Sequence, residues 1–202
     1  MENERRIDRT TSMGMDEHRL SDILHASQIK ATDIYETPPQ IIWIDNSTIA
    51  TLGNFSASTG KAKSKKTFNV SALVAASLAG KQVLNYRAHL PEGKQRILYV
   101  DTEQSRFHCR SVLERILRLA GLPTTTDPEN LDFFCLREYS PSVRIEVIDY
   151  ALRQQKGYGL VIIDGIRDLM LDINNAGESV EVINRMMEWS SRYDLHLSLI
   201  HI

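Results

Sequence analysis

The chain has 202 residues, of which 42% are hydrophobic and 25% are charged, and its formal net charge at pH 7 is −2. This length and apolar content suit one α/β domain, or most of one, with a short appendage. The near-balance of acids and bases excludes a protein whose whole surface binds nucleic acid, although it permits a local basic groove.

The N-terminal segment carries the first predicted helix. Residues 1–20 are charged and lack apolar periodicity, so we expect a mobile tail there. From about Ser21 to Ile34, apolar residues recur at helical spacing, which predicts one short amphipathic helix. Pro38 and Pro39 would end this helix. We therefore assign residues 1–40 to a tail with a short helix, and residues 41–202 to the core domain.

The core domain begins with two segments that we predict to be extended, residues 41–45 (IIWID) and residues 48–58 (TIATLGNFSAS). The Gly53–Asn54 pair predicts a turn or bulge within the second segment. A basic stretch follows, and after it comes an alanine-rich apolar run that ends at Gly80, which is typical of a buried helix.

Helices and strands then alternate to the end of the chain. The predicted strands are nearly continuous apolar runs, as expected when helices cover both faces of a parallel sheet. We therefore predict a three-layer α/β fold, with the strand before the basic stretch central and the strand at residues 131–136 towards one edge. Because the chain stops inside an apolar strand, we expect a domain truncated at its C-terminus. The predicted strands are residues 96–101, 131–136, 159–164 and 196–202, and the predicted helices are residues 68–80, 105–120, 142–155 and 178–193.

The two cysteines, Cys109 and Cys135, are far apart in the sequence and have no CxxC or His/Cys spacing. We expect free thiols in a reducing compartment, and neither a disulfide nor a zinc site. His108 precedes Cys109, but neighbours on a helix point in different directions. No apolar run reaches membrane-spanning length and the polar N-terminus is no secretory signal, so we expect a cytoplasmic protein.

The basic stretch aligns with the phosphate-binding pattern GxxxxGK[ST], except that Lys65 replaces the second glycine. A predicted strand leads in and a predicted helix leads out, so backbone N–H groups and a helix N-terminus could hold phosphates there. The alternative is a basic surface loop. If the loop needs a positive φ at Lys65, the side chain costs about 1–2 kcal/mol, which bound triphosphate could offset. The aligned residues are Gly60, Lys61, Ala62, Lys63, Ser64, Lys65, Lys66 and Thr67.

Acidic residues end two of the predicted strands. Asp164 ends residues 159–164, at the edge where open α/β sheets bind ligands, and could hold Mg²⁺ through water. The alternative is a capping Asp before a turn at Gly165. Asp101 and Glu103 follow residues 96–101 at the same edge, and a glutamate there can polarise the water that attacks a γ-phosphate. Glu103 could instead be a plain surface residue or the partner of a Lys or Arg.

The order of basic loop, VDTEQS, edge strand DFFC and LVIID resembles the RecA-like ATPase core. It is most similar to the RepA-type replicative helicase ATPases and related AAA-family proteins of bacterial mobile elements, from about Thr48 to the end. This resemblance implies that Gly60, Lys66 and Thr67 bind ATP and Mg²⁺, with Lys66 also acting in catalysis. It implies that Asp164 is the Walker B acid and Glu103 the catalytic base.

Two further residues come from the resemblance alone. Arg110 falls near the position of an adenine-stacking residue, although a solvated helix arginine is the simpler interpretation. His201 lies where the strand of the γ-phosphate sensor ends, and the family continues beyond it with a further strand and arginine-finger elements.

Three functions are compatible with these patterns. The leading hypothesis is an ATP-hydrolysing motor or switch in DNA replication, mobilisation or recombination, assembled as a homo-oligomeric ring or filament. The second is a partition-type ATPase with a deviant Walker A loop, in which Lys61 would reach across a dimer. Glu103 argues against it, as does the absence of glycine at Ala62 and Lys65. The third is a nucleotide-binding oligomerisation domain without hydrolysis.

Overall fold

The computed structural model describes residues 16–60, 65–171 and 176–200, which fall into two compact units, Met1–Thr37 and Pro38–Ile202. The first unit contains helix α1, Glu17–Ser27, none of whose residues is buried. The Asp16 side chain accepts a hydrogen bond from the His18 amide and so caps the helix. The helix therefore begins inside the expected tail, and the tail proper lies outside the described residues. It ends at Ser27, well before the prolines.

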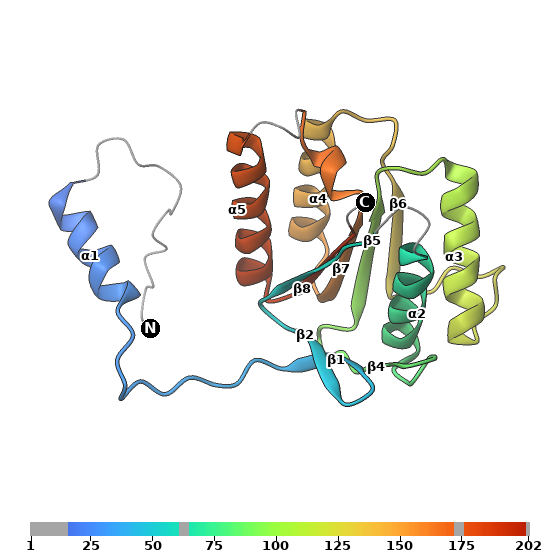
Figure 1. Ribbon diagram of the computed structural model, residues 1–202, viewed down its shortest axis with the longest axis horizontal. Coiled ribbons are helices and arrows are strands. Elements are labelled where there is room, and N and C mark those ends of the chain that lie inside the picture. Colours follow the sequence, from blue (N-terminus) through green and yellow to red (C-terminus); the bar gives the residue numbers. More distant parts are fainter. Residues whose placement is uncertain (1–15, 61–64, 172–175, 201–202) are drawn as a thin grey trace. The chain divides into compact units, whose positions relative to one another are not determined.

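A five-stranded parallel sheet forms the centre of the second unit (Figure 1). Its strand order is β3-β8-β7-β5-β6, and every neighbouring pair is parallel. The predicted α/β fold with a mainly parallel sheet is thereby confirmed. The strands are β3 (Phe55–Ser58), β5 (Arg96–Asp101), β6 (Leu131–Cys135), β7 (Tyr158–Asp164) and β8 (His196–Ile200).

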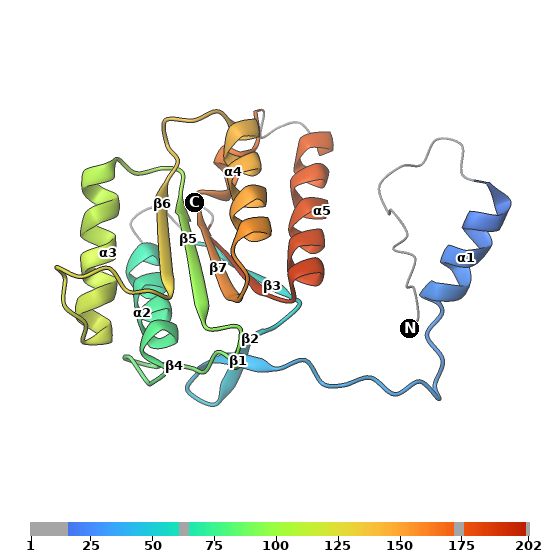
Figure 2. The same ribbon diagram turned by 180° about the vertical axis from the view of Figure 1, so that it is seen from behind.

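Helices cover both faces of this sheet, which makes three layers (Figures 1 and 2). Side chains alternate along each strand, so that Ile97 and Tyr99 of β5 pack in the core with α2 and α3, whereas Leu98 and Val100 pack in the core with α4 and α5. The helices are α2 (Lys66–Ala79), α3 (Arg106–Ala120), α4 (Pro141–Gln154) and α5 (Ala176–Tyr193), with a short 3-10 helix η1 (Ile166–Leu169) after β7.

The prediction that the strand before the basic loop is central was wrong, because β3 lies at one edge of the sheet. Strand β8 separates β3 from β7, and all five residues of β8 are buried. In β3, by contrast, Phe55 is 43% exposed and Ser58 is also exposed. The small and polar side chains of β3 suit an edge, where less apolar surface is removed from water. The strand β6 lies at the opposite edge, as predicted.

A second, antiparallel sheet was not predicted. Its order is β2-β1-β4, formed by β1 (Gln40–Ile44), β2 (Ser47–Thr51) and the short β4 (Tyr86–Ala88). The segment expected to be extended from residue 48 to 58 is therefore divided between two sheets. The division falls at Gly53, whose φ of +75° is accessible to glycine, in agreement with the predicted turn. No helix among the described residues is long and apolar enough to cross a membrane.

Candidate functional site

Two carboxylates meet at the C-terminal edge of the parallel sheet. Asp101 ends β5 and Asp164 ends β7, and the two residues are paired in register. Both are buried, with Asp101 0% and Asp164 3% exposed. Ligands bind at this edge in open parallel sheets, so the sequence prediction that places the acids at one rim agrees with the strand pairing.

Asp101 organises the turn that presents Glu103. Its Oδ1 accepts the backbone N–H of Glu103 at 3.0 Å and of Gln104 at 2.8 Å, while its Oδ2 accepts the Gln104 side-chain amide at 2.8 Å. An aspartate that binds backbone N–H groups two and three residues on is a local turn former. Sequence reasoning missed this role, although the DTEQS spacing contains the signal for it.

Glu103 is half-buried, and its carboxyl has a raised pKa. Burial is the main cause, and the negative charges of Asp168 and Asp101 add to it. The cations Lys66 and Arg167 act in the opposite direction and lower the pKa of Glu103. Glu103 therefore combines access to water with a proton affinity above that of an ordinary glutamate.

Asp164 has its pKa raised to about 7, first by burial and then by the charge of Asp101. The Tyr99 hydroxyl donates to Asp164 Oδ2 at 2.9 Å, and this hydrogen bond and the Lys66 charge both lower the pKa. The other carboxylate oxygen, Oδ1, makes no hydrogen bond within the described part of the chain. Tyr99 was not identified from the sequence, because it lies 65 residues from its partner.

The basic loop joins β3 to α2, and Lys65 is the N-cap residue of this helix with a φ of +60°. Lys65 stands at the second glycine position of the phosphate-binding pattern, and it has the positive φ that was considered there. The Lys65 carbonyl accepts the N–H groups of Phe68 and Asn69 at 3.0 and 3.1 Å. Lys66 Nζ donates to the Gly60 carbonyl at 2.6 Å. Residues 61–64, which were predicted to bind nucleotide, lie outside the described residues.

Thr67 is half-buried in the first turn of α2, one residue after Lys66. No group of three or more His, Cys, Asp or Glu residues could hold a metal ion by itself, as far as the described residues extend. Thr67 and Asp164, which do not need such a group, stay the predicted ligands of Mg²⁺. This ion takes one or two protein oxygens and completes its octahedron with water and substrate phosphates.

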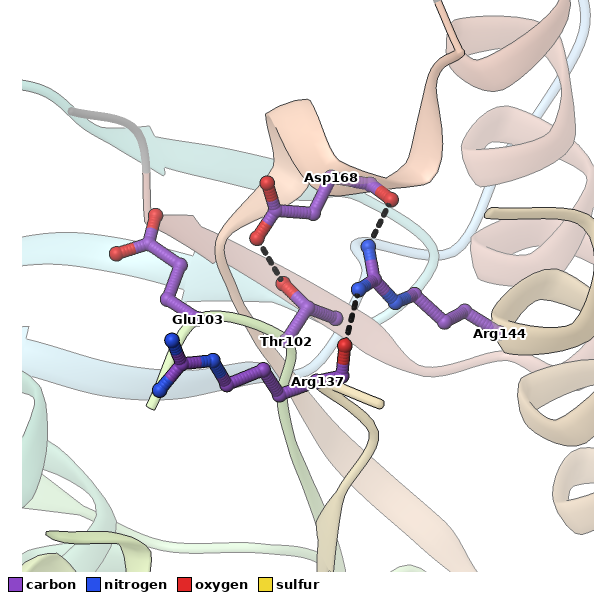
Figure 3. A pocket seen from close by; sticks show the side chains of 5 residues that line it. All are labelled: Thr102, Glu103, Arg137, Arg144 and Asp168. Atoms are coloured by element: carbon purple, nitrogen blue, oxygen red, sulfur yellow. Dashed lines mark hydrogen bonds between the residues drawn. The ribbon is translucent and has the colours of Figure 1, made fainter. Parts of the chain in front are cut away.

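A pocket of about 360 Å³ lies beside Glu103 (Figure 3). Arg144 of α4 forms part of its wall and is only 9% exposed. Its guanidinium donates to the carbonyls of Leu136 at 3.0 Å, of Arg137 at 2.7 Å and of Asp168. Arg144 thereby connects α4 to η1 and to the loop after β6. The lining residues are Thr102, Glu103, Arg137, Arg144 and Asp168.

Arg110, expected near the adenine ring, lies on α3 and is bonded elsewhere. Its Nε donates to Glu114 at 3.0 Å and its Nη2 to the Thr124 carbonyl at 2.8 Å. The thiols of Cys109 and Cys135 are free, and both donate to the Gln104 carbonyl, at 3.6 and 3.4 Å. His201 lies outside the described residues.

The unit of β3, basic loop and α2, together with buried acids at the ends of the paired strands β5 and β7, is typical of P-loop NTPase domains. A sequence profile described as AAA domain matches residues 20–201. Because this match covers most of the chain, the chain belongs to the AAA domain family.

No curated protein matches the chain significantly. Among solved structures, the crystal structure of the RadB recombinase is similar with 15% sequence identity and a TM-score of 0.47. The similarity covers 74% of this chain and 61% of that one, so the chain spans less than two thirds of the RadB chain.

Proposed function

We propose that the chain is a Mg²⁺-dependent, ATP-hydrolysing RecA-like domain. One observation carries the proposal: Lys66 begins the helix after the basic loop, while Asp164 ends β7 and Glu103 lies just beyond the end of the neighbouring strand β5. A P-loop ATPase needs this combination of one cation and two acids. The lysine neutralises phosphate charge, one acid holds the metal ion, and the other acts on the attacking water.

The proposed roles follow from the chemistry of each group. Lys66 exchanges the Gly60 carbonyl for β- and γ-phosphate oxygens, a stronger charge-assisted hydrogen bond. Thr67 and Asp164 would hold Mg²⁺, which would neutralise charge on the phosphates. Glu103 accepts a proton from water as the water oxygen bonds to the γ-phosphorus and the bond to the ADP oxygen breaks. Its raised pKa brings it closer to neutral pH, where a general base is most effective.

The remaining predicted contacts belong to the same proposal. Backbone N–H groups of residues 60–67 would surround the phosphates, with Lys61, Lys63 and Lys65 adding positive charge. Arg110 would stack on adenine only after its bonds to Glu114 and Thr124 open, which makes it the weakest member of the set.

We also propose a helicase-type motor or switch in DNA replication, mobilisation or recombination, acting in the cytoplasm as a homo-oligomeric ring or filament. This part rests on the resemblance to RepA-type ATPases, whose oligomers act on DNA.

Single-turnover hydrolysis of Mg·ATP tests the proposal. The parent should release phosphate, whereas Lys66→Ala should lose ATP binding measured by calorimetry, because the cation–phosphate contact is gone. Lys156→Ala is the matched control, since Lys156 is exposed and lies on the loop before β7. Equal ATP affinity in Lys66→Ala and in the parent would move the phosphate site elsewhere. Tight binding without hydrolysis in the parent would favour the non-hydrolysing alternative.

A further inference from the structure

Thr102 lies between Asp101 and Glu103 in the turn after β5. Its side chain makes hydrogen-bond contacts that have no part in the proposed reaction. The residue is 1% exposed. Its backbone N–H donates to the Asp164 carbonyl at 3.0 Å. Its hydroxyl lies 3.0 Å from the Asp164 carbonyl, 2.8 Å from the Gly165 carbonyl and 3.0 Å from Asp168 Oδ2. A hydroxyl has one proton, so these three oxygens compete for a single donor.

Asp168 is held from the backbone side. Its N–H donates to the Gly165 carbonyl at 3.0 Å, and its carbonyl accepts the guanidinium of Arg144. Figure 3 shows the Asp168 carboxylate directed at the Thr102 hydroxyl, with Glu103 beside them. The carboxylate that meets Thr102 therefore belongs to a segment that is fixed to α4, and it cannot follow Thr102 freely if the turn moves.

The space around the Cα atom of Gly165 is filled by neighbouring side chains. A Cβ atom on Gly165 would lie 2.3 Å from Thr102 Oγ1, 2.6 Å from Glu103 Cγ and 3.1 Å from Asp168 Oδ2. Three side chains thus converge on the one residue that follows Asp164. The distance between Glu103 and the end of β7 is set by this packing together with the Thr102 hydrogen bonds.

We propose that the hydrogen bond between Thr102 and Asp168, here called the Thr102–Asp168 latch, positions Glu103 against Asp164 for hydrolysis. Both are positioning residues, because neither needs to touch ATP. The inference rests on the proposed function, since it assigns a role to residues around the proposed base. A buried threonine that only fills space would need its methyl group and volume, whereas the latch needs its hydroxyl.

Variants at Thr102 separate these two roles. Thr102→Val keeps the shape but removes the hydroxyl. We expect it to lower the single-turnover rate by roughly 10–100-fold, the cost of a small misplacement of a catalytic group. The dissociation constant for Mg·ATP should stay within a few-fold, because the phosphates contact the basic loop. Thr102→Ser restores the hydroxyl and should recover most of the rate. A parental rate in Thr102→Val, or an equal defect in Thr102→Ser, would overturn the latch.

Variants at Asp168 test the acceptor. Asp168→Ala should reproduce the Thr102→Val defect, and the double variant should be no slower than either single variant, because both remove one interaction. Asp168→Asn keeps an acceptor oxygen and should be less defective than Asp168→Ala. Glu138→Gln, on the exposed loop after β6, is the control for loss of a nearby charge. Additive defects in the double variant would overturn the latch.

Backbone hydrogen exchange gives a readout that does not depend on hydrolysis. The Glu103 and Gln104 amides, bonded to Asp101, should exchange faster in Thr102→Val than in the parent, while the core of β7 is unchanged. Unchanged exchange at these two amides would refute the latch whether or not the chain hydrolyses ATP. A parent that binds Mg·ATP without hydrolysing it would instead refute the proposed function, and the exchange result would still decide on the latch.

Discussion

Replacing Gly165 by alanine should destabilise the domain more than any other glycine-to-alanine change in the described loops near the site. The φ of Gly165 is +100°, and an added Cβ would lie 2.3 Å from the Thr102 hydroxyl and 2.6 Å from Glu103 Cγ. A positive φ costs a non-glycine residue about 1–2 kcal/mol. Overpacking of a filled site adds about 1–3 kcal/mol, so the free energy of unfolding should fall by about 2–5 kcal/mol. Urea unfolding monitored by circular dichroism measures this loss.

Gly80 provides the matched control, because it has a φ of +60° and nothing within 4 Å of the added Cβ. Gly80→Ala should therefore lose only the conformational part, about 1–2 kcal/mol. The entropy that alanine removes from the unfolded chain is common to both variants and cancels in the comparison. If the two variants lose equal stability, the side chains of Thr102 and Glu103 do not pack against Gly165 as closely as described. Gly165→Ala should also hydrolyse Mg·ATP more slowly, since the crowding displaces Glu103.

Three further perturbations test individual groups of the site. Glu103→Gln keeps the shape but removes the base, so Mg·ATP affinity should stay within a few-fold while the single-turnover rate falls by roughly 10²–10⁴; an unchanged rate would remove Glu103 from the mechanism. Lys65→Gly removes the strain of a φ of +60° in a non-glycine residue, so the free energy of unfolding should rise by about 1 kcal/mol while ATP binding persists. If calorimetry instead shows that ATP affinity is lost, Lys65 is itself a phosphate ligand. Without Mg²⁺, the pKa of Asp164 is about 7 in the folded state and about 4 in the unfolded state. The folded state therefore binds the proton more tightly, and the stability that Asp164 contributes is lost as the pH rises from about 4 to about 7. Asp164→Asn should flatten the slope of unfolding free energy against pH, and an unaltered slope would contradict the raised pKa.

The strands that carry the acids could be predicted closely from the sequence. Apolar runs that end in an acid define β5, which spans the predicted residues, and β7, which begins one residue earlier than predicted. The local pattern suffices there because both strands are buried on both faces. Residues 55–58 of β3 lie within a segment predicted to be extended, but the position of the strand was wrong, because FSAS carries no strong apolar signal and does not indicate which strands are its neighbours. The place of β3 at the edge depends on β8, which is more than a hundred residues away.

The partners of the site residues were the least predictable part. Tyr99 on Asp164 and Arg144 on the Asp168 carbonyl are contacts between separate elements, created by strand order and helix packing. No spacing along the chain encodes them. Asp101 differs, because its partners are two and three residues away and an aspartate turn could have been inferred. The nucleotide-binding assignments at residues 61–64 and the role of Arg110 stay predictions.

The edge position of β3 gives the two sides of the candidate site unequal support from the sheet. Strands β5 and β7 each have a neighbour on both sides, so the acids they carry are fixed before any ligand arrives. Strand β3, which leads into the basic loop, pairs only with β8 among the described strands of the sheet. Ordering that accompanies ATP binding would then fall mainly on the phosphate side, and part of the binding energy would be used there. Substitutions that stiffen β3 should accordingly tighten ATP binding, whereas equivalent substitutions in β7 should not.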